Sequence, residues 1–298
     1  MTSEGDGGVS IAASAAEATD GVERGAERDR SRAVSRLQEA IDEAKAEGRA
    51  ALVAYLPVGY PDVDASIAAM VAAVEGGADV VEVGVPYSDP GMDGPVIQQA
   101  VDPAVRAGVG MRDVLRAVEA VAAAGATAVV MSYWNPIERY GVDRFAADLA
   151  AAGGAGAITP DLIPDEAAAW LAASEAHDLD RVFLVAPSST DARLAATARA
   201  CRGFVYAAST MGVTGTRAAV GDAAEELVAR TRAVTDVPVC VGLGVSNGDQ
   251  AAEVAGFADG VIVGSAYVRE LLEGRGADGV RRLSEDLAAG VRRPVAAQ

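Results

Sequence analysis

Several side chains that many enzymes require are nearly missing from this sequence. Its 298 residues contain one histidine, His177, and one lysine, Lys45. A Schiff-base or pyridoxal phosphate enzyme needs a lysine in its site, and Lys45 lies before the first β-branched run. A zinc site needs several His, Cys or carboxylate ligands, and a serine–histidine nucleophile needs a histidine in the site. The single histidine, His177, precedes the fifth β-branched run, which is the wrong end of a strand for either role. We therefore expect no metal site and no bound cofactor.

Cysteine, basic residues and long apolar runs are also scarce. The two cysteines, Cys201 and Cys240, lie far apart in sequence, which fits two free structural thiols in a reducing cytoplasm. No apolar run reaches the roughly 18–20 residues of a membrane helix, and no signal peptide is apparent. The formal charge of −18 argues against nucleic acid, whose binding requires a basic surface. We expect a soluble cytoplasmic protein without nucleic-acid or membrane partners.

The chain divides into a polar start and a long, regularly patterned remainder. Residues 1–30 are rich in Gly, Ala, Ser and acidic residues, which predicts a disordered tail. From residue 31, Val34, Leu37 and Ile41 share one helical face that ends before Gly48. Eight short β-branched runs follow, mostly separated by Ala-rich helical stretches: 50–56, 79–85, 127–133, 155–159, 181–186, 203–209, 237–244 and 259–264.

These runs are almost continuously apolar, which is typical of parallel strands covered on both faces. Eight βα units over about 250 residues match a (β/α)8 TIM barrel. An open doubly wound sheet is the competing fold, but the first run lacks the GxGxxG fingerprint of dinucleotide binding. We predict a single-domain (β/α)8 barrel over residues 31–298, with an N-terminal helix.

Glu82 interrupts the apolar run 79–85, where burying an unpaired carboxylate is costly. Strand alternation places Glu82 and Gly84 on one face and Val81 and Val83 on the other. The valine face suits packing against helices, so Glu82 should point into the barrel, with the small Gly84 leaving room beside it. No basic residue lies at an interior position of an expected strand, which favours a functional glutamate over a salt bridge.

Asp93 has two interpretations of equal weight. It precedes Gly94 and Pro95, which fits the N-cap of a helix with proline in its first turn. It also follows the second strand, whose carboxyl end should face the mouth of the barrel. Asp89, in a Ser-Asp-Pro turn, is more typical of a structural or surface residue.

Glycine-rich segments follow the sixth, seventh and eighth runs, at 212–216, 242–246 and 263–266. Backbone N–H groups and a helix N-terminus can bind an anion without lysine, and barrels often hold phosphate after strands 7 and 8. Each glycine alone also suits a tight turn, but their convergence predicts a phosphorylated ligand. With lysine, histidine and metal chemistry excluded, general acid–base catalysis by carboxyl groups remains. Tyrosines near the strand ends could either assist this catalysis or pack in the core.

Four segments together carry a family resemblance: EVGVPYSDPGMDGPVIQ (82–98), GVTG (212–215), GLGVS (242–246) and VGSA (263–266). They strongly resemble the tryptophan synthase alpha subunit, and the likeness covers essentially all of residues 31–298. The resemblance implies a cofactor-free lyase that cleaves indole-3-glycerol phosphate into indole and glyceraldehyde 3-phosphate by a retro-aldol step.

The resemblance also assigns roles to residues. It implies that Glu82 handles the proton at indole C3 and that Asp93 bonds the indole N–H. Tyr206 would lie near the substrate hydroxyls, and Thr214 of the lid loop would orient Asp93. The implied indole slot is lined by Tyr55, Ile97, Met131, Tyr133, Pro160, Leu184 and Leu243. The implied phosphate cradle is formed by Gly215, Gly244, Gly264 and Ser265.

Two positions depart from the family pattern: Thr210 replaces an expected arginine in the lid loop, and Tyr55 replaces an expected phenylalanine. The implied partner is a pyridoxal phosphate β subunit in an α2β2 complex, contacted through Asp89, Pro90 and Asn135. Three alternatives remain open. A phosphoribosyl isomerase barrel is disfavoured because strands 1 and 5 end without carboxylates. A stand-alone indole-releasing lyase is the most serious rival, and a non-catalytic activator that binds a phosphorylated ligand ranks lower.

Overall fold

The computed structural model describes residues 35–208 and 217–293. The expected tail, residues 1–30, and the lid-loop residues Thr210, Thr214 and Gly215 lie outside the described residues. The described helices are α2 (Arg36–Ala46), α3 (Val63–Glu75), α4 (Pro95–Arg106), α5 (Met111–Ala123), α6 (Trp134–Tyr140), α7 (Val142–Ala151), the 3-10 helix η1 (Pro164–Glu166), α8 (Ala168–Ala176), α9 (Asp191–Ala200), α10 (Arg217–Arg232), α11 (Gly248–Ala255), α12 (Ser265–Leu272) and α13 (Gly276–Val291).

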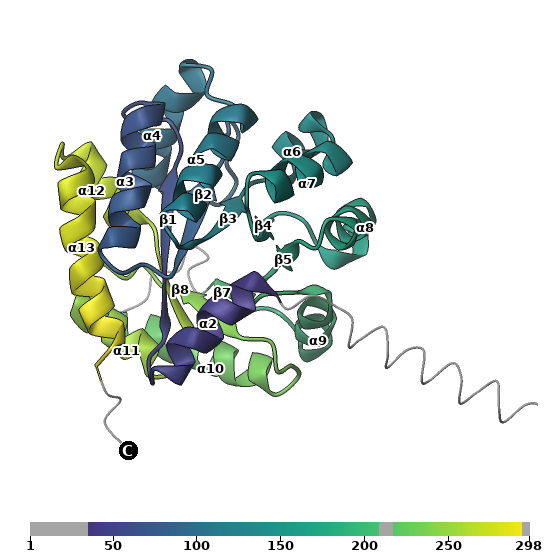
Figure 1. The fold of residues 1–298 in the computed structure, drawn as a ribbon. Coiled ribbons are helices and arrows are strands. Elements are labelled where there is room, and N and C mark those ends of the chain that lie inside the picture. The colour runs from purple at the N-terminus through teal and green to yellow at the C-terminus, as the bar shows by residue number, and fades with distance from the viewer. Residues whose placement is uncertain (1–34, 209–216, 294–298) are drawn as a thin grey trace, which may run out of the picture. The chain divides into compact units, whose positions relative to one another are not determined.

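Within the described residues, nine strands form one parallel sheet in the order β5-β4-β3-β2-β1-β9-β8-β7-β6 (Figure 1). The strands are β1 (Ala51–Pro57), β2 (Val80–Gly84), β3 (Thr127–Met131), β4 (Gly156–Ile158), β5 (Asp180–Val182), β6 (Leu184–Val185), β7 (Val205–Ala208), β8 (Val239–Gly242) and β9 (Gly260–Val263). The two end strands, β5 and β6, are separated in sequence by Phe183 alone. The sheet therefore curls into a nearly closed barrel, and the predicted (β/α)8 fold is confirmed.

The break at Phe183 is a strand feature that the sequence pattern did not predict. The run 181–186 was expected as a single strand, but β5 pairs with β4 and β6 pairs with β7. The backbone N–H of Phe183 points to the Cys201 Sγ, 3.5 Å away, instead of to a strand. The fifth barrel strand thus changes its hydrogen-bonding partner halfway along.

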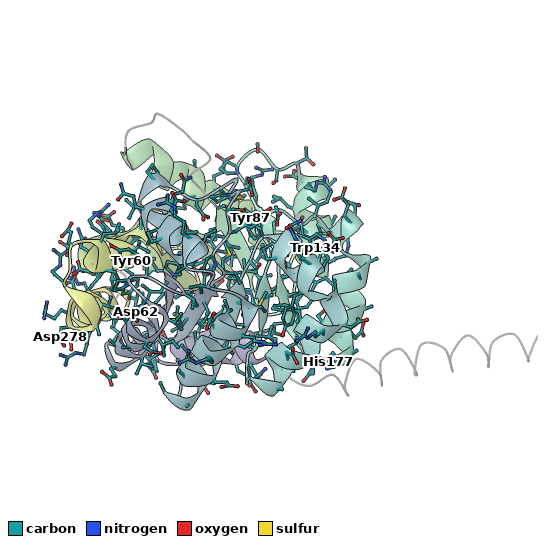
Figure 2. All side chains as sticks on the ribbon, turned by 90° about the horizontal axis from the view of Figure 1, so that it is seen from above. Tyr60, Asp62, Tyr87, Trp134, His177 and Asp278 are labelled. Atoms are coloured by element: carbon teal, nitrogen blue, oxygen red, sulfur yellow. The ribbon has the colours of Figure 1, made fainter. Side chains whose placement is uncertain are left out.

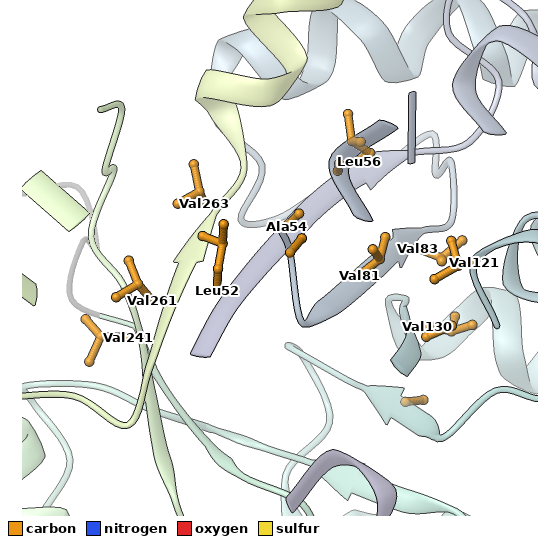
Figure 3. Packing of buried hydrophobic residues seen from close by; sticks show 14 of the residues in the cluster. Leu52, Ala54, Leu56, Val81, Val83, Val121, Val130, Val241, Val261 and Val263 are labelled. Carbon is orange, nitrogen blue, oxygen red and sulfur yellow. The ribbon is translucent and has the colours of Figure 1, made fainter. Parts of the chain in front are cut away.

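Strand alternation divides the core into two layers. Leu52, Leu56, Val81, Val83 and Val130 point outward and pack against the surrounding helices (Figure 3). A second cluster fills the barrel interior, and Leu37, Ile41 and Ala44 of α2 pack against its N-terminal end. The residues that the barrel itself contributes to this cluster are Ala51, Val53, Val80, Val129, Ala155, Ile158, Val182, Phe204, Cys240 and Ile262. The predicted outward face of β2 is therefore confirmed.

Helix α2 is fixed to the barrel by hydrogen bonds as well as by packing. Ser35 caps the helix, its Oγ accepting from the backbone N–H of Gln38 at 3.1 Å. The Leu37 backbone N–H donates to Asp180 Oδ2 at 3.0 Å, which ties the helix to β5. None of the described helices is both long and apolar enough to cross a membrane.

Candidate active site

A cavity of about 390 Å³ opens at the carboxyl ends of the strands. Its floor comes from strand residues and its rim from the loop before α4 and the start of α12. It is lined by Tyr55, Glu82, Met92, Asp93, Gly94, Ile97, Met131, Leu184, Tyr206, Ala208, Gly242, Gly244, Ile262, Gly264 and Ser265. The site therefore lies where a barrel is expected to carry it.

Glu82 lies deep in this cavity, on the inner face of β2. The residue is 1% exposed, and its Oε1 has no hydrogen-bond partner among the described residues. Burial disfavours the charged form and raises the pKa of Glu82 to about 8. Near neutral pH this carboxyl is therefore mostly protonated, and an uncharged acid inside a cavity can donate its proton to a ligand.

The side chains of Tyr55 and Tyr206 each pack directly over a glycine of a neighbouring strand. A Cβ at Gly84 would come 2.8 Å from the Tyr55 hydroxyl, and one at Gly264 would come 3.2 Å from Tyr55 Cδ1. A Cβ at Gly242 would come 2.7 Å from the Tyr206 hydroxyl. Gly84 leaves room on this face as expected, and the Tyr55 side chain occupies that space.

Asp93 contributes its side chain to the cavity and does not cap α4. The N-cap of α4 is Gly94, without a side-chain cap, so the N-cap interpretation of Asp93 was wrong. Its Oδ1 accepts a hydrogen bond from the Tyr133 hydroxyl at 2.9 Å, and that hydroxyl accepts from the Met92 N–H at 2.8 Å. Burial raises the pKa of Asp93, and the hydrogen bond from Tyr133 opposes the rise.

Three of the four predicted phosphate-binding residues line the cavity, Gly244, Gly264 and Ser265, and the fourth, Gly215, lies outside the described residues. Gly264 is the N-cap of α12, no side chain caps this helix, and Ser265 is its first residue. Gly244 follows β8 and adopts a φ of 65°, a left-handed conformation that favours glycine. The N-terminal N–H groups of α12 can therefore meet an anion in the cavity.

Most of the predicted slot residues line the cavity, but three do not. Tyr133 reaches the cavity through its hydrogen bond to Asp93. Leu243 packs against the core outside the barrel, and Pro160 follows β4 without lining the cavity. Sequence reasoning also missed the lining residues Met92, Gly94, Ala208, Gly242 and Ile262. Strand alternation could have identified Ile262, because it faces inward like Val53.

The remaining predicted residues lie outside the cavity. Asp89 and Pro90 lie on the loop after β2, the first exposed and the second half-buried, and Asn135 is an exposed residue in the first turn of α6. Figure 2 shows Tyr87, which lies on the same loop as Asp89, and Trp134, the first residue of α6. His177 is the exposed C-cap of α8 before β5, at the other end of the barrel. No group of three or more metal-ligating side chains occurs within residues 35–208 and 217–293.

Known proteins share this sequence and fold. A family model described as tryptophan synthase alpha chain matches residues 41–292. The tryptophan synthase alpha chain of Mycobacterium avium (strain 104) is 67% identical over 248 residues, covering 83% of this chain and 91% of that protein. The Mycobacterium bovis (strain BCG / Pasteur 1173P2) alpha chain is 68% identical over 243 residues, covering 82% of this chain and 89% of that protein.

Solved structures agree with the sequence comparison. A structure of Mycobacterium tuberculosis tryptophan synthase superposes with a TM-score of 0.83 at 65% identity, covering 88% of this chain and 100% of that one. The alpha chain from Legionella pneumophila subsp. pneumophila gives a TM-score of 0.76 at 30% identity, covering 88% of this chain and 98% of that one. With a matching family model, close relatives and a shared barrel, the chain belongs to the tryptophan synthase alpha chain family.

Proposed function

We propose that this chain is the alpha subunit of a tryptophan synthase and cleaves indole-3-glycerol phosphate into indole and glyceraldehyde 3-phosphate. The observation that carries the proposal is Glu82, a buried carboxyl inside the cavity whose Oε1 has no hydrogen-bond partner in the part of the chain that the structure describes. Its pKa of about 8 makes it a proton donor at neutral pH. Family membership supports the same reaction.

The chemistry needs two carboxyl groups in different states. Glu82 donates a proton to C3 of the indole ring, which leaves a positive charge on the ring. Asp93 accepts a hydrogen bond from the indole N–H and stabilises that charge. The glyceryl hydroxyl next to the ring then gives its proton to the Glu82 carboxylate left by the first step and becomes a carbonyl. The C–C bond breaks, its electron pair neutralises the ring, and Glu82 is neutral again. An uncharged acid and a carboxylate hydrogen-bonded by Tyr133 suit these two tasks.

The rest of the cavity fits the two ends of this substrate. The start of α12, with Gly264 and Ser265, would bind the phosphate, and Gly215 and Gly244 would complete its cradle. The apolar side chains of Ile97, Met131 and Leu184 line the cavity near the acids and would contact the indole ring. Anchoring the phosphate would orient the ring toward Glu82.

The partner would be a β subunit that receives the indole in an α2β2 complex. It would be contacted by Asp89 and Pro90, on the loop after β2, and by the exposed Asn135 in the first turn of α6. Two apolar side chains are exposed at the same end of the barrel: Met92, on the loop after β2, is 42% exposed, and Ile163, on the loop after β4, is 38% exposed. Hydrophobic groups beside a ligand cavity suit a contact surface.

Turnover by the Glu82→Gln variant tests the proposal. Glutamine keeps the size of the side chain but cannot donate the proton, so indole release should fall by at least about a hundredfold. Substrate affinity should change little, because the phosphate and ring contacts remain. Indole release is measured with and without a β subunit.

Asp180→Asn is the matched control, since Asp180 is a second buried carboxyl, at the opposite end of the barrel. Its turnover per folded molecule should equal that of the wild type. Absence of cleavage by the wild type in either condition would contradict the lyase assignment. Full activity of Glu82→Gln would contradict the role of Glu82, and turnover unaffected by the β subunit would favour a stand-alone lyase.

A further inference from the structure

We propose that Tyr133 is a positioning residue that holds the Asp93 carboxylate in place and directs a proton donor at it. This inference rests on the proposed function, which gives Asp93 its task. The role differs from the expected contact with the indole ring, because Tyr133 acts on the ligand through Asp93.

The direction of the hydrogen bonds fixes what the Tyr133 hydroxyl can do. A backbone N–H can only donate, so the Met92 N–H at 2.8 Å occupies a lone pair of the hydroxyl oxygen. The single hydroxyl proton is then directed to Asp93 Oδ1, 2.9 Å away. The chain of bonds runs from the Met92 amide through Tyr133 to Asp93, and it favours the carboxylate form of Asp93.

The Tyr133 side chain is itself held firmly. It is 8% exposed and lies at the N-cap of α6, directly after β3 and Ser132. The Ser132 hydroxyl donates to the Tyr133 carbonyl at 2.8 Å, which fixes the backbone at this corner. The Tyr87 ring packs against the Tyr133 ring, with 5.4 Å between the centroids and 35° between the planes. A rigid support of this kind can place a second side chain accurately.

The loop between β2 and α4 depends on this support. Tyr133 meets it at three places: the ring of Tyr87, the N–H of Met92 and the carboxylate of Asp93. Asp89, between these places, is exposed to solvent. Tyr133 therefore links the end of β3 to the part of the loop where Ser88 and Asp89 are exposed, and it sets the position of Asp93 relative to the cavity.

Among the described residues, the other groups that line the cavity do not replace this donor. The titratable side chains that line the cavity with it are Glu82, Tyr55 and Tyr206. Among the described residues, no Lys, Arg or His lines the cavity. Burial raises the pKa values of Glu82 and Asp93, and the bond from Tyr133 opposes the rise at Asp93 alone. Tyr133 thereby separates the ionisation of the two acids.

The Tyr133→Phe variant removes the hydroxyl and keeps the ring that contacts Tyr87. Loss of the donor should raise the pKa of Asp93, because its charged form loses a hydrogen bond. If Asp93 acts as a carboxylate, the acid limb of the kcat/KM profile should move to higher pH. We expect kcat to fall by about tenfold, with a smaller change in KM.

Tyr140→Phe is the matched control, because the Tyr140 hydroxyl donates to Asp148 Oδ2 at 2.6 Å on the outside of the barrel. This variant also loses a tyrosine–aspartate hydrogen bond, but its acid limb and kcat should match those of the wild type. An Asp93→Asn background supplies a second control. There, Tyr133→Phe should have little further effect on kcat, since the carboxylate it supports is gone.

A readout that does not require activity separates this inference from the proposed function. The Asp93 carboxyl is titrated by 13C NMR in the full-length protein, with Asp93→Asn used to assign its signal. Its pKa should be higher in Tyr133→Phe than in the wild type. An unchanged pKa, or an unchanged acid limb in an active Tyr133→Phe enzyme, would overturn the role of Tyr133. If the wild type does not cleave the substrate, but the Asp93 pKa measured by NMR is still higher in Tyr133→Phe, only the proposed function is overturned.

Discussion

At the scale of single residues, the site depends on giving two acids opposite surroundings. Glu82 is buried, and its Oε1 has no hydrogen-bond partner within residues 35–208 and 217–293, whereas Asp93 accepts a hydrogen bond from the Tyr133 hydroxyl. Glu82 imposes a cost on folding, because the unfolded chain ionises this carboxyl at a lower pH than the folded chain does. The protein therefore gives up some stability at neutral pH to keep a neutral acid in its cavity.

Glu82→Gln should reveal this cost as a pH-dependent gain in stability. Below pH 4.5, the ordinary pKa of glutamate, the carboxyl is protonated in both states and ionisation favours neither. As the pH rises from there to about 8, the unfolded state ionises first and the wild type loses stability. The Tm of Glu82→Gln should therefore exceed that of the wild type more at pH 8 than at pH 4. A constant difference in Tm would show that the pKa of Glu82 is not raised by folding.

How well the site could be predicted differed from one residue to the next. The inward direction of Glu82 followed from the alternation of β2, because a strand fixes the face of every residue. The surroundings of Asp93 could not be predicted, because they depend on a loop bonded to Tyr133, a residue 40 positions away. Local spacing favoured an N-cap equally, and the tertiary bond decided against it. Leu243, likewise in a loop segment, points away from the cavity.

At the scale of elements, the strands were predictable because parallel strands covered by helices are apolar along their whole length. The break at Phe183 was not, since the change of hydrogen-bonding partner depends on Cys201 and the neighbouring strands. Close approach of β4 and β5 is another property that the pattern leaves open. A Cβ at Gly156 would lie 2.1 Å from the backbone oxygen of Asp180.

Gly156→Ala should consequently destabilise the barrel strongly. The added Cβ meets only backbone atoms of Asp180, which cannot rotate away, so the two strands must separate, at a cost of about 1–3 kcal/mol or more. The shift also disturbs Asp180, whose carboxylate accepts from the Leu37 N–H and holds α2. Thermal unfolding measures the loss. Gly221→Ala in α10 is the matched control, because nothing lies within 4 Å of its added Cβ. That variant should be neutral or slightly stabilised, and an equal Tm for both variants would contradict the account.

At the scale of the whole molecule, the barrel separates stability from function. Its N-terminal end is packed against α2, which Asp180 holds by a hydrogen bond. Its C-terminal end carries the cavity, the acid pair and the glycines at the start of α12. Figure 1 shows the helices arranged around the sheet, with α13 beside α3. Ligand binding and partner contact can thus share one end while the opposite end maintains the fold.

The pH dependence of kcat/KM tests the central claim, that a neutral Glu82 donates the proton. This parameter reports the ionisation of the free enzyme, in which the pKa of Glu82 is about 8. Cleavage of indole-3-glycerol phosphate by the complex with the β subunit should therefore decline above pH 8, with one alkaline limb centred near that value. A profile that stays flat up to about pH 10 would show that no protonated carboxyl of this kind is required.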